Sequence, residues 1–474
     1  MRLFAGISKW PVGLLSCLLL AAPAVQAEVT LNSLFSDHMV LQQQANVPIW
    51  GRARPGEAVT VSFKQQTVKT TADATGKWLV KLAKEPAGGP YTLRVTGDNN
   101  LAINDVLIGE VWLCSGQSNM ERQLGPRPPQ LPLVRWEQER DAANYPQIRQ
   151  YTVPQKYASE KLDDANGNWQ VCSPQTVVDF TAVGYFFAKN LYKDRKVPIG
   201  ILNATFGGTP AEDWMSQSAL AANPELAGFV SNYAARMNLG QGWHPTGEQL
   251  SGLYNGMINP LLPYALKGVA WYQGESNNGR ADQYGNTLAA LIGNWRQDFN
   301  QGNFPFLIVQ IAPYKGTHPE LRDGQLAVTR RVLNTALIVT TDCGDANDIH
   351  PTHKQPIGER LARAAQALAY GEKIEYSGPL YQSLSAKGNQ LELRFSHTDR
   401  GLLAKDGLLK GFMIAGEDQR FVPATAVIQG KSILVYSDQV KHPVAVRYGW
   451  SDVPDVNLYN AAGLPASPFR TDGQ

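Results

Sequence analysis

The alternation of hydrophobic and polar residues changes twice along the chain. From residue 28 to about 105, short apolar runs alternate with polar residues and are separated by clusters of Gly, Pro, Asp and Asn. Runs of this length and spacing predict the short strands of a small β-sandwich. The predicted strands lie at 40–41, 47–50, 59–63, 78–80 and 91–95.

From about residue 106 the predicted strands become wholly apolar, and helical patterns lie between them. Tyr284, Leu288, Leu291 and Trp295 fall on one face of a helix, and 183–191 and 357–368 repeat that pattern. Apolar strands that alternate with helices are typical of a mostly parallel sheet covered on both faces. The predicted strands are 106–113, 199–204, 268–272, 304–311 and 336–341.

Two segments of this region, 121–150 and 215–260, are too long for plain connections and are expected to carry function or structure of their own. From about residue 375 the alternation returns, at 391–395, 432–436 and 444–448. The fold class is therefore α/β. We predict a β-sandwich-like domain at 28–105, an α/β catalytic domain at 106–375 and a C-terminal β-domain at 376–474.

The first 27 residues have the pattern of a signal peptide. Arg2 and Lys9 precede the apolar run 12–25, and Val25-Gln26-Ala27 offers a small-residue cleavage site. We expect the protein to be exported, to the periplasm or outside the cell. A lipoprotein signal ending at Cys17 is the lesser alternative. No later run reaches the roughly 20 apolar residues of a membrane span, so membrane insertion is not expected.

Charge and cysteine content narrow the choice of partners. The chain carries 43 Lys and Arg against 41 Asp and Glu, and the leader would remove two of the basic residues. Nucleic acids and anionic membranes attract proteins with a basic field, which this balance does not provide.

The cysteines after the leader are Cys114, Cys172 and Cys343, which allow at most one disulfide. Buried thiols are favoured, and a pairing of two of them stays open.

Four polar motifs each follow a predicted strand of the α/β region. Parallel strands bring their carboxyl ends to one edge of a sheet, where such folds place their ligands. The motifs are therefore expected to form one site. They are Gly116-Gln117-Ser118-Asn119, Phe206-Gly207-Gly208-Thr209, Gln273-Gly274-Glu275-Ser276-Asn277 and Asp345-Ala346-Asn347-Asp348-Ile349-His350-Pro351.

These motifs contain the groups that acyl transfer needs: a nucleophile, a base and donors for the oxyanion. Ser118 is the predicted nucleophile and His350, beside carboxylates after an apolar strand, the predicted base. The backbone amides of Ser118 and Gly208 are predicted oxyanion donors, and the side-chain amide of Asn277 or Gln273 would complete the pocket. The spacing differs from the Gly-x-Ser-x-Gly elbow, whose second glycine is replaced here by Met120.

Gly116-Gln117-Ser118-Asn119-Met120 resembles the first block of the SGNH-type esterases, specifically of the sialate O-acetylesterase family. Similar stretches lie at 34–42, 169–174, 182–187, 253–258 and 271–277, so the resemblance spans most of the chain after the leader. It implies an SGNH-like three-layer α/β/α domain and the removal of O-acetyl groups from sugars. It also implies that neither a metal nor a cofactor is needed.

The acid that orients the histidine departs from the pattern of many SGNH enzymes, which place Asp three residues before it. Asn347 occupies that position here, while Asp348 and Asp345 lie two and five residues before His350. Residues two apart share a side of an extended chain, so Asp348 is the first choice. Asp345 and Glu275 stay open, and Glu275 is equally suited to supporting its loop.

Two other classes of function compete. His350 and His353, with Asp342, Asp345 and Asp348, could ligate a metal in a hydrolase, although this leaves Ser118 without a role. The β-domains and tryptophans could instead belong to a non-catalytic carbohydrate-binding protein.

The sugar is also open between two classes. A sialic acid carboxylate would favour contacts with cations, and Arg122, Arg127 and Arg280 lie in or beside the motif loops. A plant polysaccharide such as xylan or xyloglucan would favour aromatic platforms, for which the candidates are Trp214, Trp243 and Trp271.

Overall fold

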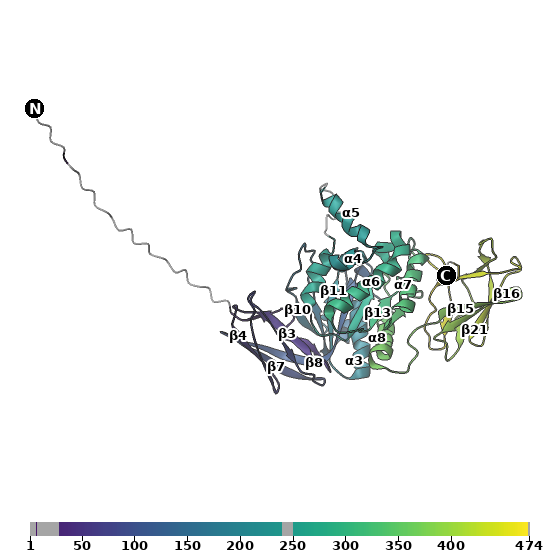
Figure 1. The fold of residues 1–474 in the computed structure, drawn as a ribbon. Helices are drawn as coiled ribbons and strands as arrows, with labels where there is room; N and C mark the ends of the chain where they lie inside the picture. Colours follow the sequence, from purple (N-terminus) through teal and green to yellow (C-terminus); the bar gives the residue numbers. More distant parts are fainter. Residues whose placement is uncertain (1–5, 7–27, 239–249, 473–474) are drawn as a thin grey trace, which may run out of the picture.

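The computed structural model describes residue 6, residues 28–238 and residues 250–472 (Figure 1). Apart from Gly6, the predicted signal peptide, including Cys17, lies outside the described residues, and so does Trp243.

The N-terminal region is built from short strands, as its alternating pattern predicts. β1, β3 and β6 form a three-stranded antiparallel sheet, while β4 pairs with β5 and with β7, which in turn pairs with β8. β5 was not predicted, because Val68 is the only large apolar residue in its sequence. The strands are β1 (Thr30–Leu31), β2 (Val40–Gln42), β3 (Val47–Arg52), β4 (Ala58–Phe63), β5 (Gln66–Thr71), β6 (Lys77–Leu82) and β7 (Gly88–Thr96).

Strand β8 (Asn100–Gly116) connects this region to the centre of the molecule. Its first half pairs antiparallel with β7, and its second half pairs parallel with β11 and β12. From Val106 onward every residue of the strand is buried. The strand therefore continues without a break across the boundary predicted between residues 105 and 106.

The central sheet has the strand order β10-β9-β11-β8-β12-β13-β14. All neighbouring pairs are parallel except the edge strand β10, which is antiparallel to β9. The five strands predicted here are present, which confirms a mixed α/β chain. The other strands of this order are β9 (Tyr145–Thr152), β10 (Asn168–Cys172), β11 (Ile199–Thr205), β12 (Gly268–Tyr272), β13 (Phe306–Val309) and β14 (Thr335–Ile338).

Helices cover both faces of this sheet (Figure 1). On β8, Trp112 and Cys114 belong to the core formed with α3 (Ala182–Arg195) and α8 (Gln355–Tyr370). Val111 and Leu113 belong to the core on the other face, formed with α6 (Ala281–Phe299) and α7 (Pro319–Arg331).

Shorter helices lie in the remaining connections, including the described parts of the two long segments, and several lie near the motifs. They are α1 (Ser118–Glu121), α2 (Trp136–Asp141), η1 (Val177–Asp179), η2 (Ala211–Trp214), α4 (Gln217–Ala222), α5 (Ala227–Asn238), η3 (Tyr254–Ile258), η4 (Asn259–Leu261) and η5 (Glu275–Arg280).

The C-terminal region is all strand within its described part, in two four-stranded sheets and one two-stranded sheet. Its three predicted strands correspond to β16, β21 and β22. The strands are β15 (Leu380–Lys387), β16 (Gln390–Ser396), β17 (Leu402–Ala404), β18 (Phe412–Ala415), β19 (Val422–Pro423), β20 (Thr425–Gln429), β21 (Ser432–Tyr436), β22 (Ala445–Tyr448), β23 (Leu458–Asn460) and β24 (Phe469–Arg470).

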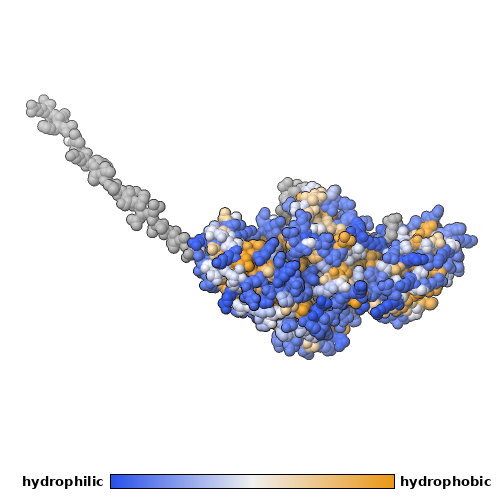
Figure 2. Space-filling view, turned by 60° about the horizontal axis from the view of Figure 1, so that its bottom comes forward, coloured by the Kyte–Doolittle hydropathy of each residue, from blue (hydrophilic) through white to orange (hydrophobic). Residues whose placement is uncertain are grey.

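The surface and the cysteines agree with the composition. In Figure 2 hydrophilic residues dominate the visible face, and hydrophobic ones are scattered among them. Cys114, Cys172 and Cys343 are free and buried, which confirms the expected buried thiols. Within residues 28–238 and 250–472, no helix combines the length and the apolar character needed to cross a membrane.

Candidate active site

The close approach of β8 and β12 places Ser118 at the carboxyl end of the central sheet. Gly116 has a φ of +131°, and a Cβ there would lie 2.2 Å from the carbonyl oxygen of Tyr272. Only glycine tolerates both conditions. The backbone N–H of Gln117 donates to the same carbonyl at 3.0 Å, and α1 begins at Ser118.

Ser118 and His350 meet across 232 residues of sequence. The Oγ of Ser118 lies 3.0 Å from the Nε2 of His350, which is hydrogen-bond distance. Gly207 of the second motif packs against the serine, because a Cβ at Gly207 would lie 3.3 Å from the Cβ of Ser118. The structure thus brings three of the four motifs together around one hydroxyl group.

Of the carboxylates near the histidine in sequence, Asp348 lies beside the ring. Its Oδ1 accepts a hydrogen bond from the backbone N–H of His350 at 2.8 Å and lies 3.8 Å from the ring Nδ1. The second distance allows charge attraction but exceeds a hydrogen bond. Asp345 instead accepts from the backbone N–H of Asn347 at 2.8 Å.

The side chain of Asn119 ties the nucleophile motif to two other motifs. Its Nδ2 donates to Oε1 of Glu275 at 2.7 Å and to the carbonyl of Ile349, next to His350, at 3.0 Å. Its Oδ1 accepts from Nζ of Lys354 at 2.6 Å. Every hydrogen-bonding atom of this amide therefore holds a segment of the site.

Glu275 is placed behind the nucleophile by these contacts, and it is not hydrogen-bonded to His350. The third motif is held further by Gln117, whose Oε1 accepts from the backbone N–H groups of Gly274 and Ser276, both at 3.2 Å. The geometry thus places Glu275 in a supporting position.

Lys354 was not predicted as a site residue, and Asn119 was named in the first motif without a role of its own. Lys354 is 1% exposed, and its burial lowers its pKa to about 7, an effect that Glu275 opposes. Burial raises the pKa of Glu275, while the hydrogen bond from Asn119 and the charge of Lys354 lower it. The two groups form a buried pair of opposite charge, bridged by the Asn119 amide. A lone lysine four residues after the histidine carries no sequence pattern that would reveal this.

The surroundings of His350 keep its imidazole neutral. Burial lowers the pKa of His350 below its ordinary value of 6.5, and the charge of Lys354 lowers it further. Asp348 acts in the opposite direction, while Arg127 and Arg122 add to the lowering. A neutral imidazole is the form that can accept a proton from Ser118.

The predicted oxyanion donors differ in their availability. Nε2 of Gln273 donates to the carbonyl of Thr209 at 3.1 Å and to Oδ1 of Asn277 at 2.7 Å. Nδ2 of Asn277 donates to Oε2 of Glu212 at 2.8 Å, and both amide side chains are buried. The geometry therefore gives the two side chains internal roles. The backbone N–H of Gly208 is in an exposed turn and has no acceptor among the described residues.

The structure corrects the expected aromatic platforms. Trp214 and Trp271 are both 0% exposed and pack edge-to-face with ring centroids 6.0 Å apart. They belong to the core and cannot stack on a sugar ring. The apolar pattern of their segments is the same for a core position and a platform, so the sequence could not separate the two.

Arg122 is corrected in the same way. It is 1% exposed, and its guanidinium donates to the carbonyls of Gln123, Gly125 and Leu131 at 2.7, 2.8 and 3.1 Å. Its role is to hold the loop after α1. Arg127 forms an ion pair with Glu121 and keeps 37% of its side chain exposed, so it is a cation that a ligand can reach.

The side-chain geometry does not favour the metal alternative. In the described part of the chain, no three or more His, Cys, Asp or Glu side chains are grouped so that they could hold a metal ion. His353 is exposed, whereas His350 faces Ser118.

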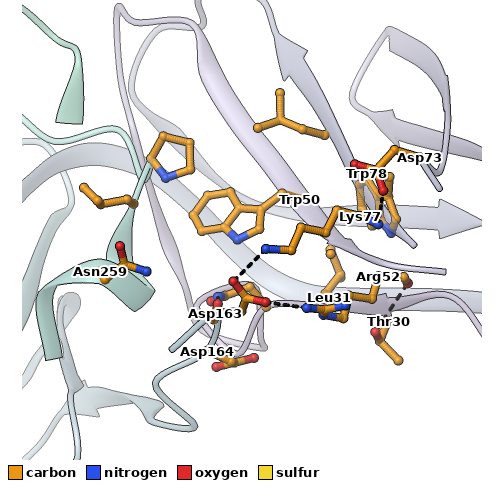
Figure 3. A pocket seen from close by; sticks show the side chains of 15 residues that line it. Thr30, Leu31, Trp50, Arg52, Asp73, Lys77, Trp78, Asp163, Asp164 and Asn259 are labelled. Atoms are coloured by element: carbon orange, nitrogen blue, oxygen red, sulfur yellow. Dashed lines mark hydrogen bonds and ion pairs between the residues drawn. The ribbon is translucent and has the colours of Figure 1, made fainter. Parts of the chain in front are cut away.

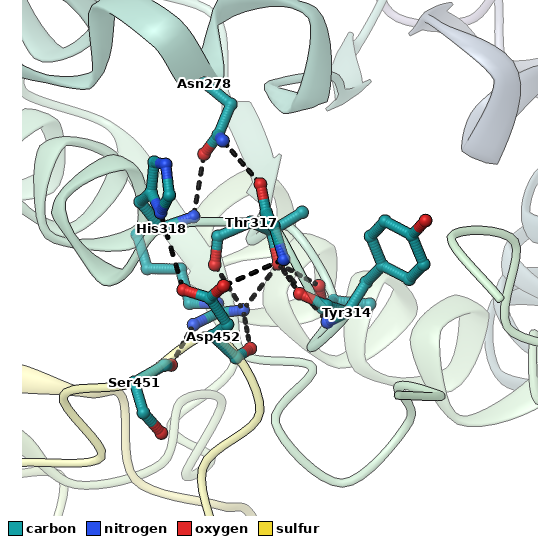
Figure 4. A network of polar contacts seen from close by, with 9 residues as sticks. Asn278, Tyr314, Thr317, His318, Ser451 and Asp452 are labelled. Carbon is teal, nitrogen blue, oxygen red and sulfur yellow. Dashed lines mark hydrogen bonds and ion pairs between the residues drawn. The ribbon is translucent and has the colours of Figure 1, made fainter. Parts of the chain in front are cut away.

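The C-terminal region supports the third motif from outside (Figure 4). Asn278 of η5 accepts from the backbone N–H of His318 at 2.7 Å and donates to the carbonyl of Gly316 at 2.5 Å. The carboxylate of Asp452 accepts from the N–H of Gly316 at 2.8 Å, and Arg322 donates to the carbonyl of Asp452 at 2.7 Å. The loop that contacts η5 is thus fixed by the last part of the chain.

Comparisons with known proteins agree on one family. The family profile described as "Carbohydrate esterase, sialic acid-specific acetylesterase" matches residues 108–367. The chain is 30% identical to the sialate O-acetylesterase of Homo sapiens, over 92% of this chain and 91% of that protein. It is also 30% identical to that of Rattus norvegicus, over 98% of both chains.

A solved structure is similar over nearly the whole length. The crystal structure of a carbohydrate acetylesterase from Xanthomonas citri superposes with a TM-score of 0.85 at 41% sequence identity. The match covers 94% of this chain and 100% of that chain.

Replacing Lys354 with methionine tests the charge behind the site. With a pKa of about 7, Lys354 is mostly charged in the range where His350 titrates, and this charge lowers the pKa of His350. Its loss is expected to raise that pKa, so the acidic limb of the kcat/KM profile moves to higher pH. The control is Lys315→Met, which removes an exposed lysine bound to Asn347 at 3.0 Å. An unmoved acidic limb in Lys354→Met would contradict the assignment.

Replacing Asp348 with asparagine should move the same limb to lower pH, since the carboxylate raises the pKa of His350. We also expect kcat to fall by about ten- to a hundredfold, less than for a tightly hydrogen-bonded triad acid. Asp345→Asn should stay within about twofold, because Asp345 does not touch the ring. Equal losses of kcat in Asp348→Asn and Asp345→Asn would show that Asp348 is not the acid that supports His350. Steady-state kinetics between pH 4.5 and 9 measure both effects.

Proposed function

Because the chain belongs to the carbohydrate esterase family of sialic acid-specific acetylesterases, we propose that it hydrolyses O-acetyl esters of carbohydrates through a serine-bound acetyl intermediate. Membership of this family makes the protein a carboxylic ester hydrolase. The observation that carries the serine mechanism is the 3.0 Å contact between Ser118 Oγ and His350 Nε2.

In the proposed first step His350 takes the proton of Ser118 as its Oγ attacks the acetyl carbonyl carbon. The negative charge on the carbonyl oxygen is stabilised by the backbone N–H groups of Ser118 and Gly208. The imidazolium then gives its proton to the ester oxygen of the sugar as the bond between this oxygen and the acetyl carbon breaks. The sugar leaves with a free hydroxyl group, and the acetyl group stays on Ser118.

In the second step water takes the place of the serine hydroxyl. His350 accepts a proton from water, which attacks the acetyl-serine ester, and the proton returns to Ser118 as acetate leaves. Asp348, 3.8 Å from Nδ1, stabilises the imidazolium by its charge in both steps. Asn119 keeps the two catalytic segments in register by its bonds to Glu275 and Ile349.

We also propose a fold type for the catalytic region and a cellular location for the protein. A parallel sheet with helices on both faces and Ser118 at its carboxyl end supports an SGNH-like three-layer catalytic unit. The pattern of residues 1–27 supports export to the periplasm or beyond.

The two candidate classes of acetylated sugar differ in their need for the cation that a ligand can reach. Arg127 forms an ion pair with Glu121, which lies on the same short helix as Ser118. Its charge would suit the carboxylate of a sialic acid. Neutral plant polysaccharides such as acetylated xylan or xyloglucan would not need it. Acetate release from acetylated sialosides, xylan and xyloglucan, measured with unaltered protein and with Arg127→Ala, separates the two. A loss confined to sialosides would support the first substrate.

Ser118→Ala is expected to lower kcat on p-nitrophenyl acetate and on acetylated sugars by at least about 10⁴-fold. His350→Ala should be similarly inactive, because the two groups act as one unit. The matched control is His38→Ala: His38 also lies beside a carboxylate, 2.7 Å from Asp105, but among the N-terminal strands. Near-parental turnover by Ser118→Ala, with an unchanged melting temperature, would refute the mechanism.

A further inference from the structure

A cavity of about 390 Å³ lies between the N-terminal strands and two loops of the central region (Figure 3). Its walls come from β1, β3 and β6 and from the segments 163–164 and 259–263. No residue of the four motifs lines it. Its volume is within the range of small-ligand sites.

One wall of this cavity is apolar. Trp50 is half-buried and stands in the middle of the lining residues in Figure 3. Leu31, Leu262 and Pro263 are also half-buried, and Leu79 is 42% exposed. The rings of Phe35 and Tyr264 pack edge-to-face with this indole, with centroids at 4.6 and 6.3 Å, and the aliphatic side chains line the same cavity. A partly exposed indole offers the flat apolar surface on which the C–H face of a sugar ring packs.

The polar residues of the lining carry charges of both signs. Asp163 lies between two cations, with Nζ of Lys77 at 2.8 Å and Arg52 in a second ion pair. Asp164 accepts from the backbone N–H of Ser33 at 2.9 Å. The lining has two cations, Arg52 and Lys77, against three carboxylates, those of Asp73, Asp163 and Asp164. It therefore suits neutral hydroxyl groups better than an anionic ligand.

From these features we propose that the cavity is a second carbohydrate site, which binds an unacetylated part of a neutral sugar chain. The choice of carbohydrate rests on the proposed function. A polymer held at this site would remain near the protein while Ser118 acts on another of its residues. Binding here then raises the apparent affinity for polymers and leaves small esters unaffected.

The test uses two exposed leucines. Leu79→Glu places a flexible charge in the cavity, while Leu408→Glu makes the same change at a residue that is 87% exposed in the C-terminal region. Calorimetry with deacetylated xylan and xyloglucan oligosaccharides should show binding to the unaltered full-length protein. We expect Leu79→Glu to weaken it by about tenfold or more and Leu408→Glu to leave it unchanged.

A second pair of variants for the same binding measurement is Trp50→Ala and its control Trp136→Ala, which also removes a half-buried tryptophan. Turnover of p-nitrophenyl acetate should be the same in Leu79→Glu and Leu408→Glu as in the unaltered protein. Equal binding by Leu79→Glu and Leu408→Glu, no binding of neutral oligosaccharides, or tighter binding of free sialic acid would each overturn the proposal. Failure of the esterase proposal would appear separately, as absence of acetate release by the unaltered protein.

Discussion

The hydrogen bonds of one buried amide hold the active site together. Asn119 joins the end of β8 to the third motif and to the backbone beside the histidine, so three loops from distant parts of the chain share one small side chain. Each loop follows a strand of the parallel sheet, which fixes where it begins but not where it ends. The hydrogen bonds of the Asn119 amide join these loops to one another beside Ser118 and His350.

Buried charge is the cost of this arrangement. Lys354 and Glu275 are both removed from water, and the burial of either alone would be strongly unfavourable. Asn119 lies between them and hydrogen-bonds to both, so their opposite charges offset each other without direct contact. A net positive field at His350 remains, which suits a residue that must be neutral before it takes a proton.

Two kinds of feature could be predicted from the sequence: strands and helices with a clear hydrophobic pattern, and site residues that directly follow a strand. Apolar runs located five of the seven strands of the central sheet, and the polar motifs after them located Ser118 and His350. β9 was missed because polar residues such as Arg149 and Gln150 are buried within it. The roles of Trp214, Trp271 and Arg122 were misjudged because exposure depends on packing between distant segments. Lys354 was missed for the same reason.

The continuity of β8 has a consequence for the evolution and engineering of this chain. A domain attached by a flexible linker can be lost, exchanged or duplicated with little effect on its neighbour. Here the strand that ends at the nucleophile begins in the N-terminal sheet, and its register is fixed at both ends. A cut at the apparent border would leave the central strand of the catalytic sheet without its anchor. The two regions are therefore expected to fold as one unit, because they share this strand.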